Sequence, residues 1–340
     1  YAACESVLIR SKGKATGVDR VTVGQFKEGL DGKLESLRLE LKRGTYCPQP
    51  LRRVLIPKAN GKTRPLGIPC LRDKIVQEAM RMALEPIFEV EFHDNSYGFR
   101  PNRSTHHAVF RCQNLMHTGF TWVIEGDVKA CFDEISHEAI LSSVREKVMD
   151  NKFIDLVKRL LKSGVQIDAV VQPTVKGVPQ GGVVSPLLSN AVLNRLDWFL
   201  HDKGAYDKEC RRIRYRQHSN IRFVRYADDW CVFITRGSKK LAEDLREQIR
   251  EFLIRECGLR LSEEKTHITH VRDGIDFLGF HIKMGIGQSG KLVPKIEITT
   301  KARTNVLKRL NETVRFRPQQ ESISNRIIRG SSVRIGWANY

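Results

Sequence analysis

Several patterns that define common protein classes are missing from this 340-residue sequence. It has no secretory signal pattern, and no apolar run reaches the roughly 18 residues that suggest a membrane-spanning helix. Internal repeats and tracts of low complexity are also absent. We therefore expect a globular chain with no membrane partner and with enough length for roughly two units of about 150 residues each.

The cysteines and histidines form no metal-binding pattern. No two of the eight cysteines make a Cys-x-x-Cys pair, and the histidine spacing matches no zinc site. We interpret the cysteines as small buried side chains with free thiols, which fits a reducing, cytoplasmic location in a bacterium. They are Cys4, Cys47, Cys70, Cys112, Cys131, Cys210, Cys231 and Cys257.

Acidic residues are scarce relative to basic ones. The chain has 39 Asp and Glu against 58 Lys and Arg, a formal net charge of +19. Such an excess predicts a polyanionic partner, because phosphates neutralised by Lys and Arg release condensed counterions. The basic residues are spread through apolar segments, which favours a folded basic channel over a disordered arm. Any RNA-binding protein can share this excess, so charge alone selects no enzyme.

Two adjacent acids interrupt an apolar segment between residues 222 and 234. The sequence is Tyr226-Ala227-Asp228-Asp229, with β-forming residues on both sides and no Gly or Pro for an ordinary turn. The pattern predicts two strands that meet at a tight bend. Carboxylates that repel each other and lose hydration need compensation, and a divalent cation is the usual compensating group. A solvated surface hairpin is the alternative.

A second acid at the end of an apolar run favours the metal site. Residues 121–124 are apolar or β-forming, and Asp127 closes the run three residues later. A strand that carries Asp127 beside the hairpin of Asp228 would present both carboxylates to one pair of Mg²⁺ ions. Two such ions, about 3.5–4 Å apart, stabilise the attacking and the leaving oxygen of a phosphoryl displacement.

The remaining pattern predicts an α+β chain. Around the acids the order is strand, helix, hairpin, helix, strand, which is the split βαβ, ferredoxin-like plan. Residues 201–220 are very basic and predict a mobile surface loop. Apolar positions at helical spacing over 20–44 and a helix start at Ser104 complete the N-terminal half. The other predicted helices are 71–85 (ended or kinked by Pro86), 104–116, 137–162, 185–200 and 239–257, and residues 300–340 are expected to be helical. A strand is expected at 52–57, and further strands through 259–283 and 291–299.

At this point the chain resembles a known family. The Tyr226-Ala227-Asp228-Asp229 box, with Asp127 upstream and Phe132 five residues after it, is similar to the palm of reverse transcriptases. Further motifs are similar to group II intron-encoded reverse transcriptases, also called maturases, and follow the order expected of them. These motifs are residues 16–19, 53–69, 96–104, 177–190 and 277–280.

The resemblance implies a right-hand polymerase with a ferredoxin-like palm, mixed α/β fingers and the start of a helical thumb. We expect fingers with an N-terminal extension at 1–120. The palm is expected at 121–299, with 150–200 partly returning to the fingers, and a truncated thumb or maturase domain at 300–340. Such an enzyme uses two Mg²⁺ ions per active site, which Mn²⁺ could replace.

The resemblance also implies roles for the acids and their neighbours. Asp127, Asp228 and the backbone carbonyl of Val128 are the expected metal ligands, and Asp229 is a supporting acid. Lys265 matches a position near the departing pyrophosphate, although an exposed lysine on a charged loop explains it equally well.

Nucleotide contacts are expected from two further segments. Lys58 and Arg64 flank an Asn-Gly turn and correspond to the grip on the incoming triphosphate, with Lys62 as an alternative and a solvated hairpin tip as the simpler explanation. Gln180 and Gly181 lie in a loop that approaches the sugar or template base.

The last three expectations concern shape and template. Phe132 corresponds to a steric gate that excludes the 2′-hydroxyl of a ribonucleotide, or is simply a core residue. Ala227, being small, leaves room for the primer end. Arg100 and Arg103, beside aromatic side chains, resemble a template contact suited to single-stranded RNA.

The favoured function is an RNA-directed DNA polymerase that copies group II intron RNA during retrohoming. Its partners would be intron RNA, an RNA template with a DNA primer and deoxynucleoside triphosphates; a homodimer is possible. A protein that only binds intron RNA and assists splicing is the second hypothesis. A retron, diversity-generating or CRISPR-associated reverse transcriptase is the third.

Overall fold

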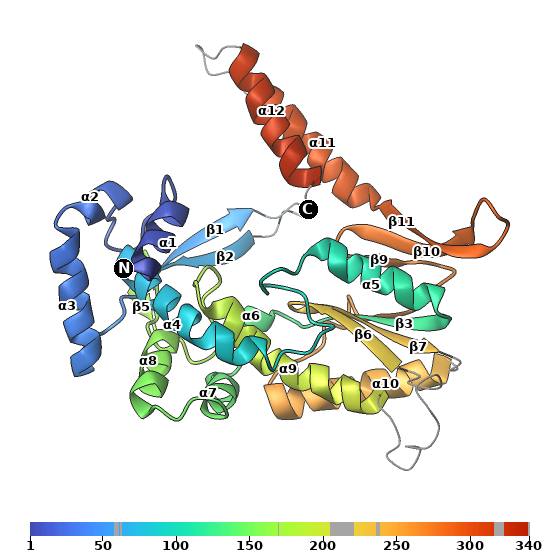
Figure 1. The fold of residues 1–340 in the computed structure, drawn as a ribbon, viewed down its shortest axis with the longest axis horizontal. Coiled ribbons are helices and arrows are strands. Elements are labelled where there is room, and N and C mark those ends of the chain that lie inside the picture. The colour runs from blue at the N-terminus through green and yellow to red at the C-terminus, as the bar shows by residue number, and fades with distance from the viewer. Residues whose placement is uncertain are drawn as a thin grey trace. The chain divides into compact units, whose positions relative to one another are not determined.

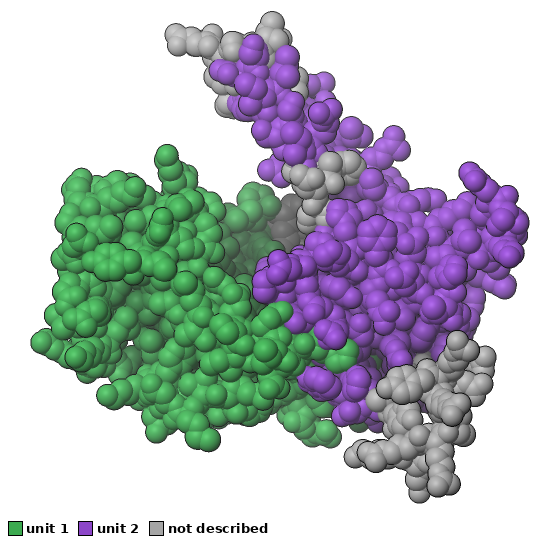
Figure 2. Space-filling model, in the orientation of Figure 1, with its two compact units in different colours: residues 1–93, 128–196, 249–261 green, residues 94–127, 197–248, 262–340 purple. Residues whose placement is uncertain are grey.

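The computed structural model describes residues 1–57, 61, 63–168, 170–204, 221–235, 239–315 and 323–338. Lys58, Lys62, most of the basic segment 201–220 and the last two residues lie outside them. The described part divides into two compact units (Figure 2). The first comprises Tyr1–His93, Val128–Leu196 and Ile249–Leu261, and the second comprises Asp94–Asp127, Asp197–Gln248 and Ser262–Tyr340.

The first unit combines helices with a small mixed sheet (Figure 1). Its strands are ordered β2-β1-β4-β5; β1 pairs antiparallel with β2 and parallel with β4. Its strands are β1 (Leu51–Pro57), β2 (Thr63–Ile68), β4 (Val165–Ile167) and β5 (Val170–Gln172). Its helices are α1 (Ala2–Ser11), α2 (Val23–Lys27), α3 (Leu30–Arg43), α4 (Leu71–Glu89), α6 (Cys131–Glu134), α7 (His137–Arg145), α8 (Asn151–Leu161), most of α9 (Ser185–Gly204) and the π-helical segment Leu253–Cys257.

The second unit holds two antiparallel sheets, ordered β6-β7-β3-β8 and β11-β10-β9. The first sheet consists of β3 (Phe120–Asp127), β6 (Ile221–Tyr226), β7 (Asp229–Thr235) and β8 (His267–His270). The second consists of β9 (Ile275–Phe277), β10 (Phe280–Ile286) and β11 (Leu292–Ile298). The helices are α5 (Thr105–His117), most of α10 (Lys239–Phe252), α11 (Thr300–Arg315) and α12 (Ile323–Ala338).

The four-stranded sheet has the predicted ferredoxin-like plan. Its first strand in the chain, β3, lies between β7 and the last strand, β8, and every neighbouring pair is antiparallel. This order brings the end of β3 beside the β6–β7 hairpin, although more than 90 residues separate them in sequence. The topology therefore gathers the predicted acids at one sheet edge.

An apolar core fixes this sheet. Helix α5 packs against it through Ala108 and Cys112, both fully buried, and β3 and β7 add Val123 and Phe233, likewise 0% exposed. Complete burial of an apolar side chain as large as Val123 or Phe233 stabilises the fold by about 1.5–3 kcal/mol. Residues of β9 and β10 belong to the same buried cluster, so the sheet that carries the acids is anchored to the second sheet as well as to α5.

Three predicted helices differ from the structure at their boundaries. The predicted helix 137–162 is wrong as one element: α7 ends at Arg145, and Asp150 begins α8 by accepting hydrogen bonds from the N–H groups of Lys152 and Phe153 at 2.8 and 3.4 Å. Segment 20–44 likewise forms two helices, because Gly29 takes a left-handed φ of 65° between them.

Pro86 does not end α4, which continues to Glu89. Proline removes one backbone donor, and near the end of a helix that loss affects little of the hydrogen-bond ladder. The strands expected through 259–283 begin only at His267, and the helical region expected over 300–340 holds two described helices, α11 and α12. The predicted helices 104–116, 185–200 and 239–257 and the strands 52–57 and 291–299 are found within a few residues of their expected bounds. No described helix combines the length and the apolar character that crossing a membrane requires.

Candidate active site

Three carboxylates meet where β3 ends and the β6–β7 hairpin turns. Asp127 is the last residue of β3 and stands directly opposite Asp229, the first residue of β7. Directly opposed residues of an antiparallel pair present their side chains on the same face. Asp228 lies next to Ala227 in the two-residue turn that joins β6 to β7. The predicted gathering of the acids at one edge is therefore what the structure shows.

The electrostatics of Asp229 report this crowding. The pKa of Asp229 is raised to about 7, mainly by burial and then by the negative charges of Asp127 and Asp228. The positive charge of Lys265 partly opposes this rise. Like charges within a few ångström disfavour ionisation in this way. A cation placed among the three acids would relieve the same repulsion.

One protein cation already contacts this group. The Nζ of Lys265 donates to Oδ2 of Asp127 at 2.7 Å, and this bond is the main reason why the pKa of Lys265 is raised. Lys265 thus lies beside the predicted metal ligand itself, and not on a remote charged loop. Whether it acts on the departing pyrophosphate stays a prediction.

The donor set fits a hard divalent cation. Asp127 and Asp228 offer carboxylate oxygens, and Val128, whose carbonyl is the third expected ligand, follows Asp127 in the chain. Within the described residues, no three side chains among His, Cys, Asp and Glu form a ready-made metal cluster. Mg²⁺ needs no such cluster, since it is usually bound by one or two carboxylates together with water and substrate phosphates.

A fourth acid near the edge was not predicted. Glu125, two residues before Asp127 on β3, accepts hydrogen bonds from Oγ1 of Thr269 at 2.5 Å and from the N–H of Asp276 at 3.0 Å. Burial raises its pKa. The two-residue spacing in a strand was the sequence signal that places Glu125 and Asp127 on the same face.

The acidic turn is supported by residues 95–98. The N–H of Arg225 donates to the carbonyl of Asn95 at 2.9 Å, and the N–H of Tyr97 donates to the carbonyl of Arg225 at 2.8 Å. Gly98 then packs on the turn so closely that a Cβ there would lie 2.3 Å from the backbone nitrogen of Ala227. The Tyr97-Gly98 part of the motif therefore fits the hairpin, which the sequence pattern did not reveal.

In the first unit, two of the residues predicted to bind nucleotide, Arg64 and Gln180, belong to one hydrogen-bonded chain. Nε of Arg64 donates to Oε1 of Gln180 at 2.8 Å, and Nε2 of Gln180 donates to Oδ2 of Asp133 at 2.7 Å. Asp133 was not predicted; partial burial raises its pKa, and the charges of Arg53 and Arg64 oppose that rise. Because both ends of the Gln180 amide are bonded, its orientation is fixed.

The neighbours of Gln180 are tightly placed. Gly181 has a φ of 105°, and a Cβ there would lie 2.8 Å from the carbonyl oxygen of Gly67. Phe132 lies in the short helix α6 with a partly exposed side chain, and its carbonyl accepts from Val178 at 2.7 Å. Lys58, the other predicted grip residue, lies outside the described residues.

The two arginines predicted to contact template bond to the protein itself. Arg100 is 7% exposed, and its Nη1 donates to the carbonyl of Ser96 at 2.9 Å. Arg103 lies over the ring of Tyr97, 5.5 Å from its centroid, and pairs with Asp94 at 3.2 Å. Both side chains thus hold the segment that supports the acidic turn, and their contact with template stays a prediction.

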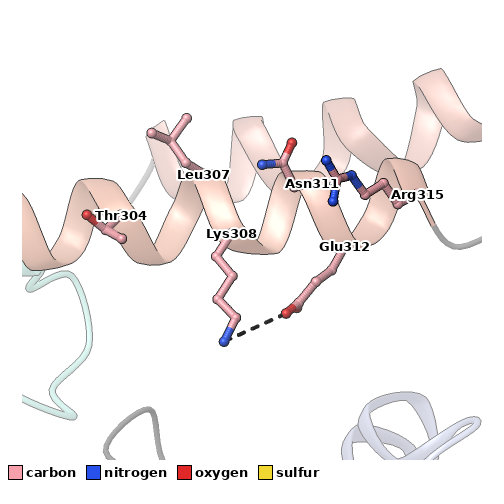
Figure 3. A pocket seen from close by; sticks show the side chains of 6 residues that line it. All are labelled: Thr304, Leu307, Lys308, Asn311, Glu312 and Arg315. Carbon is pink, nitrogen blue, oxygen red and sulfur yellow. Dashed lines mark ion pairs between the residues drawn. The ribbon is translucent and has the colours of Figure 1, made fainter.

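A pocket in the second unit is lined by residues of α11 (Figure 3). Lys308 and Glu312, one helical turn apart, form an ion pair at 4.0 Å on its lining. None of the predicted site residues lines it. The lining residues are Thr304, Leu307, Lys308, Asn311, Glu312 and Arg315.

The four-stranded antiparallel sheet carries Asp127 at the end of β3 and Asp228 and Asp229 at the β6–β7 hairpin, in a chain with a formal charge of +19. This arrangement is typical of a nucleic-acid polymerase. The family described as reverse transcriptase (RNA-dependent DNA polymerase) matches residues 56–282. The chain therefore belongs to the reverse transcriptase family, and the predicted enzyme class is confirmed.

The relatives confirm the resemblance to intron-encoded enzymes. Group II intron-encoded protein LtrA of Lactococcus lactis subsp. cremoris is 36% identical over 345 residues, covering 86% of this chain and 57% of LtrA. Protein YkfC of Escherichia coli (strain K12) is 42% identical over 304 residues, covering 83% of this chain and 79% of YkfC. The chain thus spans little more than half the length of LtrA.

Solved structures confirm the right-hand polymerase fold. Apo telomerase from Candida tropicalis superimposes with a TM-score of 0.53 at 12% identity, over 92% of this chain and 61% of that one. Telomerase from Candida albicans gives a TM-score of 0.50 at 12% identity, over 93% of this chain and 58% of that one. At this identity the likeness concerns the fold alone.

The packing of Gly98 generates a stability prediction. Gly98→Ala should lower the free energy of unfolding by about 1–3 kcal/mol or more, because the new methyl group overlaps the backbone of the turn. Urea denaturation followed by circular dichroism measures the change. Gly32→Ala is the matched control, since a Cβ at Gly32 meets nothing within 4 Å and Ala favours its helix. Equal midpoints for Gly98→Ala and wild type would show that the turn tolerates the methyl group.

Proposed function

We propose that the chain is the polymerase part of a group II intron-encoded protein and extends a DNA primer on an RNA template. The observation that carries this is the placement of Asp127 opposite Asp229, with Asp228 in the adjoining turn. Acids concentrated at one edge weaken the binding of RNA to a basic protein. Their presence is explained by metal-dependent nucleotidyl transfer and not by RNA binding alone.

Asp127, Asp228 and the carbonyl of Val128 would hold two Mg²⁺ ions, or Mn²⁺ in their place. Bound there, the ions supply charge stabilisation to the attacking primer 3′-oxygen and to the departing pyrophosphate. Asp229 contributes negative charge beside Asp127 and supports the pair. Lys265, whose Nζ donates to Asp127, would turn to the pyrophosphate once that bond is released, and would donate a proton to it.

The first unit supplies the expected nucleotide contacts. Arg64 presents a guanidinium suited to phosphate, with Lys58 as its predicted neighbour. Gln180 has its amide fixed by Arg64 and Asp133 and reaches the sugar or template base, next to Gly181. Phe132 is the proposed barrier to a 2′-hydroxyl.

The proposed domain assignment follows the polymerase plan. Residues 1–120 form the fingers with their N-terminal extension, and 121–299 form the palm, with 150–200 returning in part to the fingers. Residues 300–340, which include α11 and α12, begin the thumb. Ala227 leaves room for the primer end at the palm, and Arg100 and Arg103 contact template. A bacterial cytoplasmic location and a homodimer complete the proposal.

The proposed biology is the copying of intron RNA during retrohoming, together with binding of that RNA to assist splicing. The names of the relatives support it: LtrA is a group II intron-encoded protein, and the putative COX1/OXI3 intron 1 protein of Saccharomyces cerevisiae is 35% identical over 307 residues. A splicing-only protein would not need the three acids, and a retron or diversity-generating enzyme would keep the same chemistry with another RNA.

The direct test is primer extension on poly(rA)/oligo(dT). We expect incorporation of dTTP that requires Mg²⁺ or Mn²⁺ and stops with a chelator, and far less incorporation of UTP. RNA binding without any extension would favour the splicing-only alternative.

Replacing the turn acid should separate catalysis from binding. Asp228→Asn keeps the shape of the side chain and removes its charge. We expect roughly hundredfold or greater loss of primer extension, since a metal contact contributes several kcal/mol to the transition state. RNA affinity, measured by filter binding, should stay equal or rise slightly. Asp244→Asn, an exposed acid on α10, is the control and should leave both unchanged. Loss of RNA affinity in Asp228→Asn would mean that the acid is structural.

Truncating the proposed gate should relax sugar selection. Phe132→Ala is expected to raise UTP incorporation relative to dTTP by about tenfold or more, because one removed steric clash is worth that much discrimination. Single-nucleotide extension kinetics measure the ratio. Phe110→Ala removes a 54%-exposed ring from α5 and should not change it. Unaltered selectivity in Phe132→Ala would leave the ring as an ordinary packing residue.

Removing the anchor of Gln180 should weaken nucleotide binding. Asp133→Ala frees Nε2 of Gln180, so we expect the KM for dTTP to rise about threefold to tenfold, which corresponds to the loss of one charge-assisted hydrogen bond. Glu134→Ala is the matched control, because this neighbouring carboxylate pairs with Lys176 and not with Gln180. A KM equal to that of Glu134→Ala would disconnect Asp133 from nucleotide binding.

A further inference from the structure

Two charged side chains of the second unit are fully buried next to the acidic turn. Arg225, three residues before Asp228, and Asp197 of α9 are both 0% exposed. Nε and Nη2 of Arg225 donate to the two carboxylate oxygens of Asp197 at 2.7 and 2.6 Å. This two-pronged geometry is the strongest form of an arginine–carboxylate contact.

The third nitrogen of the same guanidinium contacts the turn. Nη1 of Arg225 donates to the carbonyl oxygen of Ala227 at 2.9 Å. That carbonyl belongs to the peptide that joins Ala227 to Asp228. Holding its oxygen fixes the plane of this peptide, and therefore the direction in which the chain enters Asp228.

The turn is a conformation that needs such a hold. Ala227 has a φ of 58°, in the left-handed region that glycine adopts freely and alanine does not. Strained backbone of this kind persists only where the surroundings determine it. Gly98 packs against the backbone of Ala227, and the guanidinium of Arg225 binds the carbonyl oxygen of the same residue.

Stability alone is a poor explanation for a fully buried ion pair. Removing two charges from water is costly, and well-packed apolar residues of similar volume often serve the fold as well or better. A buried pair whose arginine also reaches the peptide next to a metal ligand has a more specific use.

We propose that Arg225 and Asp197 are positioning residues for the reaction: Asp197 fixes the guanidinium of Arg225, which holds the carbonyl of Ala227 and so aims the carboxylate of Asp228 at the metal site. The proposal rests on the proposed function, since it assumes that Asp228 binds a divalent ion. Arginine is required because three planar donors are used at once, and the single ammonium of lysine cannot supply them.

Two variants test the proposal. Arg225→Lys keeps a buried positive charge for Asp197 and loses the planar donors. The double variant Arg225→Met, Asp197→Leu removes both charges, so that it leaves no unpaired ion in the core. Arg81→Lys is the matched control, because Arg81 also pairs with a buried carboxylate, that of Glu78, in the other unit.

Metal binding is the decisive readout. Binding of Mn²⁺ is measured by electron paramagnetic resonance, with dTTP and poly(rA)/oligo(dT) whose primer ends in a dideoxynucleotide, so no turnover is needed. Folding is followed by circular dichroism, and kcat and KM by extension of an ordinary primer. We expect both variants to fold, with Mn²⁺ affinity and kcat each lowered about tenfold or more and with primer–template affinity unchanged; Arg81→Lys should change none of the three.

Two results would overturn the proposal. One is a folded double variant that binds Mn²⁺ and extends primers like wild type. The other is failure of both variants to fold while Arg81→Lys folds, which would make the pair a device of stability and not of positioning. Wild-type protein that neither binds Mn²⁺ nor extends a primer would instead remove the proposed function, so the two failures are distinguishable.

Discussion

The repulsion among three carboxylates is the constraint on which the rest of the structure depends. Asp127, Asp228 and Asp229 meet at one sheet edge, and burial together with its neighbours raises the pKa of Asp229 to about 7. In a chain with a formal charge of +19, such a concentration of negative charge is local and specific. It creates an affinity for small cations inside a protein that otherwise attracts phosphates.

Much of the surrounding structure keeps these acids in place. The strand order β6-β7-β3-β8 brings β3 beside the hairpin, and the buried core under α5 anchors the sheet. Residues 95–98, Arg225 and Asp197 then restrain a turn whose alanine has a left-handed backbone. Nucleotidyl transfer needs charges that are already oriented before the reaction, because reorienting them during it would raise the barrier.

The sequence predicted elements whose signals are local. Alternating and continuous apolar runs predicted β3, β6 and β7, and the acid pair between strands predicted the bend. Boundaries set by single residues were less visible: the helix expected over 137–162 breaks because Asp150 caps a new helix, and Gly29 divides the helical spacing of 20–44. These breaks depend on one backbone conformation or one hydrogen bond, which periodicity does not record.

Contacts between distant segments were beyond the sequence pattern. Asp133 and Gln180 are 47 residues apart, and Arg225 and Asp197 are 28 apart. Each looks like an ordinary charged or polar residue until the fold brings its partner within 3 Å. A shorter contact is equally invisible in the sequence: Arg100, suggested as a template contact by its aromatic neighbours, donates to the carbonyl of Ser96 four residues earlier.

Locating the metal itself is the most direct test of the central claim. Crystals of the protein with a dideoxy-terminated primer on an RNA template, dTTP and Mn²⁺ would show anomalous scattering from each bound ion. The account predicts two peaks within coordination distance of Asp127 and Asp228. Ordered nucleotide with no peak at these carboxylates, or with ions bound elsewhere, would contradict it.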